Sequence, residues 1–279
     1  MEKMFRLKSH EQFVVQIFLV AWTLVVIAPL LLAVSNSLKP LGMVLRDPFG
    51  LPPALDFSNY VQVWSRGNFG TYFFNSVLVA GGSVALTVWF GSMAAYVLAR
   101  YEFPLNRWLV VVFLLGLVLP LRVGIVPLYV LLRDLGLLDN RFGLILVYVA
   151  SSLPFAVFVL TGFFKGVSRD IEDAARVDGA GPIRTYFEII LPLIRPAVAT
   201  VAIFTFVSVW NDFFFPLLFI SSGDLRTLPL GLSVLFAEFS VQWHLLFAGL
   251  VVMMMPTIVA FLVASRAFVQ GLTMGAVNE

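Results

Sequence analysis

Six long stretches of uncharged, mostly apolar residues dominate this 279-residue chain. An α-helix needs about 20 such residues to cross the hydrocarbon core of a bilayer. The chain is 60% hydrophobic and 12% charged, with a mean hydropathy of +0.97, whereas a soluble domain carries about 25% charged residues. One globular core cannot bury this much apolar surface. The sequence therefore predicts an integral membrane protein and excludes a soluble enzyme, a coiled coil and a disordered chain.

We expect an all-α integral membrane protein in which residues 1–279 form a single transmembrane domain. The third and fifth spans are each interrupted by one charge, Arg122 and Asp212. The expected helices are about 13–34, 73–98, 108–132, 142–164, 196–220 and 244–265. A cleaved signal peptide is an alternative for the first span, but the apolar part of a signal is only about 7–15 residues long. The second span is rich in glycine, as at Gly81, Gly82 and Gly91, which favours close helix packing.

The basic residues predict the orientation of the chain. With the N-terminus inside, the inner segments contain eleven Lys and Arg residues and the outer segments contain six. The positive-inside rule then places both termini in the cytoplasm.

Several classes of chemistry lack their residues. There is no cysteine, and the histidines are His10 and His244 alone, so we expect neither catalytic residues nor a metal site. No G-x-x-x-x-G-K pattern is present, so this chain is not expected to bind ATP. The net charge of +2 is too small to indicate a nucleic-acid partner.

The segment 165–195 is the most highly charged part of the chain and faces the cytoplasm in this topology. Ser168 and Asp170 are typical of a helix start, and Gly179 is typical of a helix end. Pro182 suits the first position of a second short helix. The pattern predicts two amphipathic helices outside the membrane. Docking on a partner and lying on the lipid surface are both open explanations of their apolar faces.

Residues 173–180, Asp-Ala-Ala-Arg-Val-Asp-Gly-Ala, followed by Ile-Ile-Leu-Pro at 189–192, resemble the EAA loop. That loop defines the permease subunits of binding-protein-dependent ABC importers. Asp173 stands where the family usually has glutamate, and the neighbouring Glu172 could substitute for it. The resemblance implies that this loop is a coupling helix that docks on a cytoplasmic ATPase. The implied coupling residues are Glu172, Asp173, Ala174, Ala175, Asp178, Gly179, Ala180 and Phe187.

Further segments resemble the carbohydrate-uptake branch, related to the inner-membrane subunit of the maltose transporter. They include Asn59-Tyr60, Asn75-Ser76, Pro127-Leu128-Tyr129, 135–139, Trp210-Asn211-Asp212 and 271–277. The resemblance implies the type I ABC importer permease fold and a multi-pass protein of a bacterial or archaeal inner membrane. It implies four kinds of partner: a second, homologous permease, an ATPase dimer that holds ATP and Mg, a solute-binding protein and a sugar or oligosaccharide. Glycerol phosphate or another polar solute is an alternative substrate, and an ion-coupled secondary transporter is an alternative class.

The same resemblance implies that the tail contacts the ATPase, with Gly271, Thr273 and Gly275 as candidates. Relatives commonly carry lysine where Asn278 stands here. The outer loop 221–243 would reach into the solute-binding protein through Glu238 and Phe239, or be an ordinary connector.

Polar and charged residues within the spans are candidates for the transport pathway, since such groups are costly in lipid. The candidates are Asn75, Arg122, Trp210, Asn211 and Asp212. The alternative for Asp212 is pairing with Arg122 or capping of a broken helix, and for Asn75 and Asn211 it is helix packing.

Overall fold

The computed structural model describes residues 9–66, 68–119, 121–238 and 242–276, and these residues form helices, turns and loops without a β-strand. They fall into two compact units. One lies within residues 1–68 and 232–254, and the other within 69–231 and 255–279. The all-helical architecture confirms the expected fold class.

The first unit contains the first predicted span. Helix α1 covers Ser9–Ser37 and exposes its apolar side chains along most of its length, as a helix in contact with lipid would. Two short helices follow, α2 (Leu41–Arg46) and α3 (Ser58–Arg66). The unit also contains the end of α13 (Leu228–Glu238) and the beginning of α14 (Trp243–Ala276).

A fully buried lysine organises the segment after α1. The Lys39 ammonium group donates to the Asn36 side-chain oxygen at 3.2 Å and to the Asp47 carbonyl at 2.9 Å. The buried Asn59 side chain donates to the carbonyls of Ser37 and Lys39, at 2.8 and 2.9 Å. Side chains thus satisfy backbone groups at the end of α1 and in the loop that follows it, as burial requires.

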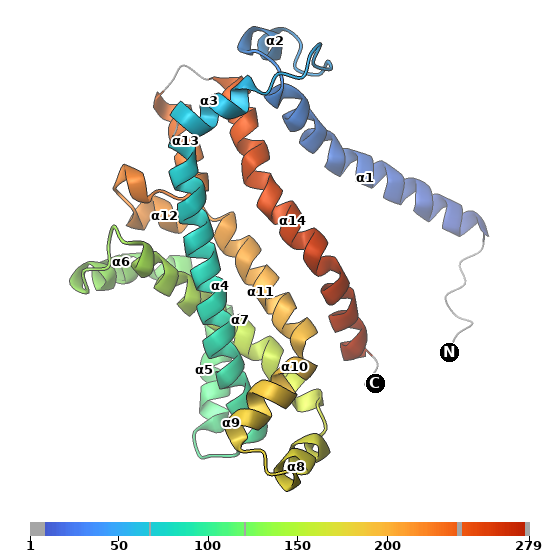
Figure 1. Ribbon diagram of the computed structural model, residues 1–279, viewed down its shortest axis with the longest axis vertical. Helices are drawn as coiled ribbons and strands as arrows, with labels where there is room; N and C mark the ends of the chain where they lie inside the picture. The colour runs from blue at the N-terminus through green and yellow to red at the C-terminus, as the bar shows by residue number, and fades with distance from the viewer. Residues whose placement is uncertain (1–8, 67, 120, 239–241, 277–279) are drawn as a thin grey trace. The chain divides into compact units, whose positions relative to one another are not determined.

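The second unit is a bundle around α4 (Phe69–Arg100), which packs against α7 (Arg141–Gly166) and α11 (Arg195–Trp210) (Figure 1). The elements between α4 and α7 are α5 (Asn106–Val118), η1 (Leu121–Gly124) and α6 (Ile125–Asp134). Those between α7 and α11 are α8 (Arg169–Val177), α9 (Pro182–Arg184), the π-helix η2 (Thr185–Ile190) and α10 (Leu191–Leu193). After α11 come α12 (Phe214–Phe219) and η3 (Gly223–Leu225).

Glycines allow α4 and α7 to approach closely. A Cβ atom on Gly91 would lie 2.9 Å from the Cβ atom of Ala156, and one on Gly82 would lie 3.0 Å from Ile145. The predicted packing role thus holds at Gly82 and Gly91, whereas a Cβ atom on Gly81 would meet no heavy atom within 4 Å.

Among the described residues, four helices are long and apolar enough to cross a membrane: Gln12–Ser37, Phe69–Arg100, Arg141–Gly166 and Trp243–Val263. In the same described residues, two further pairs of helices pass the test together, and the number rises to six if each bent pair is counted as one span. These pairs are Asn106–Val118 with Arg122–Asp134, bent by 82°, and Pro182–Leu193 with Arg195–Trp210, bent by 77°.

Two predicted spans are not continuous helices. The third, expected over 108–132, divides into α5 and α6, and Pro127 lies in the first turn of α6, where a missing N–H is tolerated. The fifth, expected over 196–220, divides into α11 and α12. The Asp212 carboxylate lies at this break and accepts a hydrogen bond from the Phe215 amide, in the first turn of α12, at 3.0 Å.

The loops that follow α6 and α12 are joined through one carboxylate. Asp139 accepts hydrogen bonds from the backbone amides of Ser221 and Ser222, at 2.9 and 2.8 Å, and from the Ser222 hydroxyl. These donors hold the pKa of the Asp139 carboxyl below its ordinary value.

Candidate functional site

A cavity of about 470 Å³ lies among the helices of the second unit, lined by side chains from η1, α7, α11 and α12. The lining combines two charged groups, several hydroxyls and aromatic rings. Its residues are Arg122, Tyr148, Ser151, Ser152, Phe155, Phe204, Thr205, Ser208, Asp212 and Phe215. The cavity brings together Arg122 and Asp212, the two charged residues that the sequence places inside spans.

Asp212 is held on several sides. Its carboxylate accepts hydrogen bonds from the Tyr148 hydroxyl at 2.9 Å and from the Phe215 amide at 3.0 Å. The Arg122 guanidinium lies 3.6 Å from its other oxygen. Both parts of the structural alternative for Asp212 are thus present, the pairing with Arg122 and the helix cap. The carboxylate nevertheless lines the cavity, so its structural role and a role in the pathway are compatible.

Arg122 is held more loosely than Asp212. Its side chain is 67% exposed, and its guanidinium carbon lies 5.0 Å from the centre of the Phe214 ring. A separation of 3.6 Å and high exposure leave the guanidinium donors available to another group. The cavity therefore contains one cation and one anion, and its formal charge is balanced.

The remaining cavity side chains offer hydroxyls and aromatic faces. Within the part of the chain that the structure describes, the buried Thr205 hydroxyl has no hydrogen-bond partner in the protein, and Ser152 and Ser208 add two further hydroxyls to the lining. The rings of Phe155 and Phe204 lie 5.4 Å apart. Free hydroxyls beside aromatic rings can bind a polar solute that also has apolar C–H faces.

The other predicted pathway residues lie elsewhere. Asn75 is fully buried, and its amide group donates to the carbonyls of Asp224 and Arg226 at 2.8 and 2.9 Å, which agrees with the packing alternative. Trp210 is buried and its ring stacks on Phe206, with centroids 5.5 Å apart. Asn211 is exposed and donates to the Val207 carbonyl of its own helix at 2.8 Å. None of these three side chains lines the cavity.

Tyr148, Ser151, Ser152 and Ser208 were not among the candidates from sequence. A signal for them exists: Thr205, Ser208 and Asp212 follow one another at spacings of three and four, which place polar groups on one side of a helix.

The coupling segment folds as its sequence predicts. Ser168 is the N-cap of α8, and its hydroxyl accepts a hydrogen bond from the Asp170 amide at 3.2 Å. Gly179 ends the helix with a φ of 80°, a conformation that favours glycine. The amide groups of Gly179 and Ala180 then donate to the carbonyls of Arg176 and Ala175, at 3.1 and 2.9 Å, which is a Schellman motif. Pro182 begins α9 as expected.

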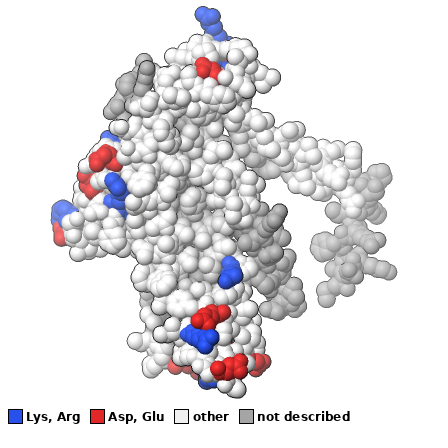
Figure 2. Space-filling view, viewed as in Figure 1, with Lys and Arg blue, Asp and Glu red and all other residues white. Residues whose placement is uncertain are grey.

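The predicted coupling residues lie on two different faces of this segment. Ala175 is buried and Glu172 is nearly so, whereas Asp173, Ala174 and Asp178 are exposed. Phe187 of η2 lies with its ring 5.6 Å from that of Trp89 on α4. Figure 2 shows charged side chains gathered over α8 and α9, while the neighbouring middle of the bundle has almost none on this face.

Apolar side chains accompany those charges. Ile171 and Val177 of α8 and Ile183 of α9 are exposed, and Val177 is 87% exposed. An exposed apolar set with a charged rim is typical of a protein or membrane contact.

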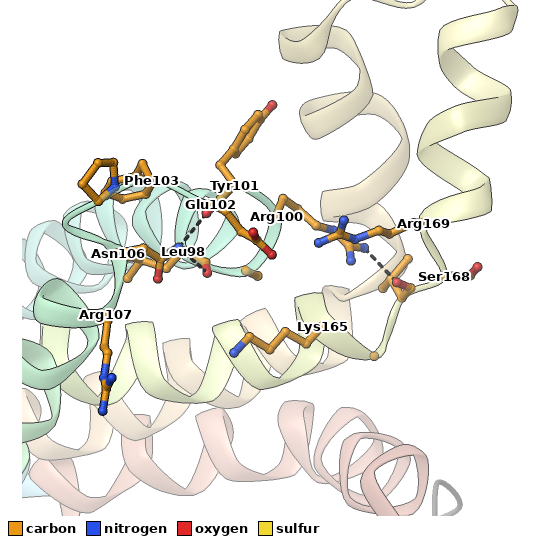
Figure 3. A pocket seen from close by; sticks show the side chains of 14 residues that line it. Leu98, Arg100, Tyr101, Glu102, Phe103, Asn106, Arg107, Lys165, Ser168 and Arg169 are labelled. Carbon is orange, nitrogen blue, oxygen red and sulfur yellow. Dashed lines mark hydrogen bonds between the residues drawn. The ribbon is translucent and has the colours of Figure 1, made fainter.

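A polar pocket of about 730 Å³ lies where α4 ends and α8 begins, lined by 98–104, Asn106, Arg107 and 165–169 (Figure 3). Arg100 lies at one side of it and donates to the Val167 carbonyl at 2.9 Å. Arg107, Lys165 and Arg169 also line it. These four basic residues, which the predicted topology assigns to the inner side of the membrane, thus gather at one end of the bundle.

The outer loop and the tail, the two other predicted contact regions, lie partly outside the described residues. Phe239 and Asn278 are outside the described residues, and Glu238 is the last residue of α13. Gly271, Thr273 and Gly275 lie within α14. In the described ranges, no group of three or more His, Cys, Asp or Glu residues could hold a metal ion.

The apolar helices of the described residues, with an exposed amphipathic helix between two of them, are the architecture of an integral membrane protein. Residues 87–274 match the family described as "Binding-protein-dependent transport system inner membrane component". The chain belongs to this family, the permease subunits of ABC importers, and is a non-catalytic membrane component of such a transporter.

Individual members of this family are similar to the chain over most of its length. The chain is 39% identical to the diacetylchitobiose uptake system permease protein NgcG of Streptomyces coelicolor, over 92% of this chain and 86% of that one. It is 32% identical to the melibiose/raffinose/stachyose import permease protein MelC of Bacillus subtilis, over 90% and 91%. It also resembles a crystal structure of a bacterial ABC transporter involved in the import of the acidic polysaccharide alginate. There the TM-score is 0.82 at 25% identity, over 95% of this chain and 99% of that one. The type I permease fold and the resemblance to carbohydrate-uptake permeases are thereby confirmed.

Proposed function

We propose that this chain forms one half of the pathway by which an ABC importer moves a sugar or oligosaccharide across an inner membrane. A second, homologous permease forms the other half. A solute-binding protein delivers the solute, and a separate ATPase dimer binds ATP with Mg and supplies the energy. The chain acts as one transmembrane domain with both termini in the cytoplasm.

The cavity around Asp212 and Arg122 is the observation that supports this solute class. Its hydroxyls and the rings of Phe155 and Phe204 suit a molecule that has many hydroxyls and apolar faces. The balanced charge favours a neutral solute, because the Asp212 carboxylate would repel a phosphate that approached Arg122. Glycerol phosphate is accordingly the weaker alternative. The relatives named for diacetylchitobiose and for melibiose, raffinose and stachyose point the same way.

The coupling surface is the exposed side of α8 and α9. Asp173, Ala174 and Asp178 lie on it together with apolar residues such as Val177 and Ile183. An ATPase would cover this apolar set and pair with its acidic residues. Gly271, Thr273 and Gly275 of the tail would add to the contact, and Glu238 and Phe239 would meet the binding protein.

Copurification tests the class of transporter. A tagged chain should bring with it an ATPase, a second permease and a solute-binding protein. The complex in proteoliposomes should take up N,N′-diacetylchitobiose, melibiose or raffinose, presented with the copurified binding protein, only when ATP is supplied inside. Uptake by this chain alone under an ion gradient would instead show a secondary transporter.

A further inference from the structure

Glu172 connects the coupling helix to the membrane bundle. Its carboxylate lies 2.5 Å from the Arg100 guanidinium, at the last residue of α4. The Tyr96 hydroxyl, one helical turn earlier, donates to its second oxygen at 3.4 Å. Arg100, which is labelled in Figure 3, also donates to the carbonyl of Val167, the residue before the α8 N-cap. One arginine thus holds both the beginning and the first turn of α8.

This contact is shielded from solvent. The side chains of Arg100 and Glu172 are 5% and 13% exposed. Tyr96 belongs to a buried cluster in which its ring lies 5.4 Å from Phe164 of α7 and 5.0 Å from Tyr186 of η2. A buried charge that loses its partner is strongly unfavourable. The pair therefore keeps α8 against the end of α4 whenever both charges are present.

The next residue points to the other side of the helix. The Asp173 side chain is 63% exposed and pairs only with Arg176, at 3.0 Å on the same helix. The two adjacent acids are thus separated by their surroundings. Glu172 is occupied inside the permease, and Asp173 remains accessible from outside.

We propose that Glu172 is a positioning residue, which transmits movement of the docked ATPase from α8 to α4 through Arg100, rather than an ATPase contact. This inference rests on the proposed function. Without the pair, α8 would still dock through its exposed face, but its displacement would no longer move α4 with it. ATP hydrolysis would then proceed with less transport.

The test uses the reconstituted complex of permeases, ATPase and binding protein, with two readouts. The first is the amount of ATPase bound per permease. The second is the number of ATP molecules hydrolysed per solute molecule transported. The solute is whichever of N,N′-diacetylchitobiose, melibiose or raffinose the wild type takes up. We expect Glu172→Gln and Arg100→Gln to bind the ATPase within twofold of wild type and to raise the ATP-to-solute ratio at least fivefold. Asp134→Asn removes an exposed pair with Arg133 and serves as the matched control with unchanged readouts.

A reversed pair provides the rescue. Arg100→Glu combined with Glu172→Arg should recover at least half of the wild-type coupling, and Tyr96→Phe should raise the ratio about twofold. Where a single variant does not accumulate in the membrane, recovery of accumulation and coupling in the reversed pair supports the proposal, and its failure overturns it. If Glu172→Gln reduced the amount of bound ATPase as severely as Asp173→Asn does, Glu172 would be a direct ATPase contact. That result would overturn the proposal. Wild-type behaviour of Glu172→Gln would do the same. If the wild-type chain itself binds no ATPase, the proposed function fails instead.

Discussion

Two arginine–carboxylate pairs in the second unit share the same chemistry but have different surroundings. Arg100 and Glu172 lie 2.5 Å apart, and both side chains are almost excluded from solvent. Arg122 and Asp212 lie 3.6 Å apart, and Arg122 is two-thirds exposed. The first pair joins two helices, and the second lines a cavity.

The difference indicates which groups are committed to the structure. At the buried pair each charge depends on the other, since removal of one leaves an uncompensated charge. At the cavity, the Asp212 carboxylate has hydrogen bonds from the Tyr148 hydroxyl and the Phe215 amide that do not depend on Arg122. Arg122 is therefore held more loosely than Asp212, while Arg100 and Glu172 are held to each other in a buried pair.

Breaking the buried pair should have the largest effect on stability. Arg100→Gln leaves Glu172 buried without its cation, so we expect the free energy of unfolding to fall by about 3–5 kcal/mol. Thermal unfolding of the purified chain in detergent measures the loss. A fall no larger than that of Asp134→Asn would show that the pair is solvated and would remove the contrast with Arg122.

Gly179→Val should have the next largest effect. A Cβ atom there meets no heavy atom within 4 Å, so the cost comes from the backbone, which holds a φ of 80°. The left-handed conformation costs an L-residue about 1–2 kcal/mol, and a β-branched one is especially unsuited to it. We expect the end of α8 to unwind and ATPase binding to weaken. Gly181, which has no positive φ, provides the control: Gly181→Ala should bind the ATPase normally.

Arg122→Gln should separate stability from transport. An exposed pair contributes less than about 1 kcal/mol, so the unfolding temperature should barely change. The apparent affinity for the transported sugar should fall severalfold, because the cavity loses its cation and keeps Asp212. Equal changes in Arg122→Gln and Arg100→Gln, in unfolding and in uptake alike, would contradict the distinction between the pairs.

Asp139 is a third carboxylate for this comparison, and its hydrogen-bond donors are neutral. Its replacement should have the smallest effect on stability. Its pKa lies below the ordinary value of 3.8 because Ser221 and Ser222 donate to the ionised form. The stabilisation is therefore complete above about pH 5 and is lost as the pH falls through the lowered pKa. We expect Asp139→Asn to unfold more easily than wild type at pH 7 and the difference to shrink towards pH 3. A difference independent of pH would argue against the ionised carboxylate.

The coupling segment was predictable because its signals are local. Ser168, Gly179 and Pro182 each determine the backbone within a few residues, and the structure places them at the expected N-cap, helix end and N1 position. The breaks in the third and fifth spans were only partly indicated. A charge or a proline marks a weak point, but the bend depends on which distant groups satisfy the freed backbone.

The cavity and the role of Glu172 required the structure for a related reason. Tyr148 and Asp212 are 64 residues apart, and Arg100 and Glu172 are 72 residues apart, so no local pattern connects them. Sequence alone assigned both adjacent acids, Glu172 and Asp173, to the ATPase-coupling residues. Burial against the end of α4 distinguishes them.

The most direct test of the central claim is protection of α8 by the ATPase. The chain has no cysteine, so Asp173→Cys provides a single thiol on the exposed face, and Asp134→Cys provides one on an exposed site outside the coupling segment. Both should react with a maleimide at similar rates in membranes that contain the permeases alone. Addition of the copurified ATPase should slow the reaction at position 173 at least fivefold and leave position 134 unchanged. Equal labelling of position 173 with and without the ATPase would contradict the assignment of α8 as the coupling helix of an importer.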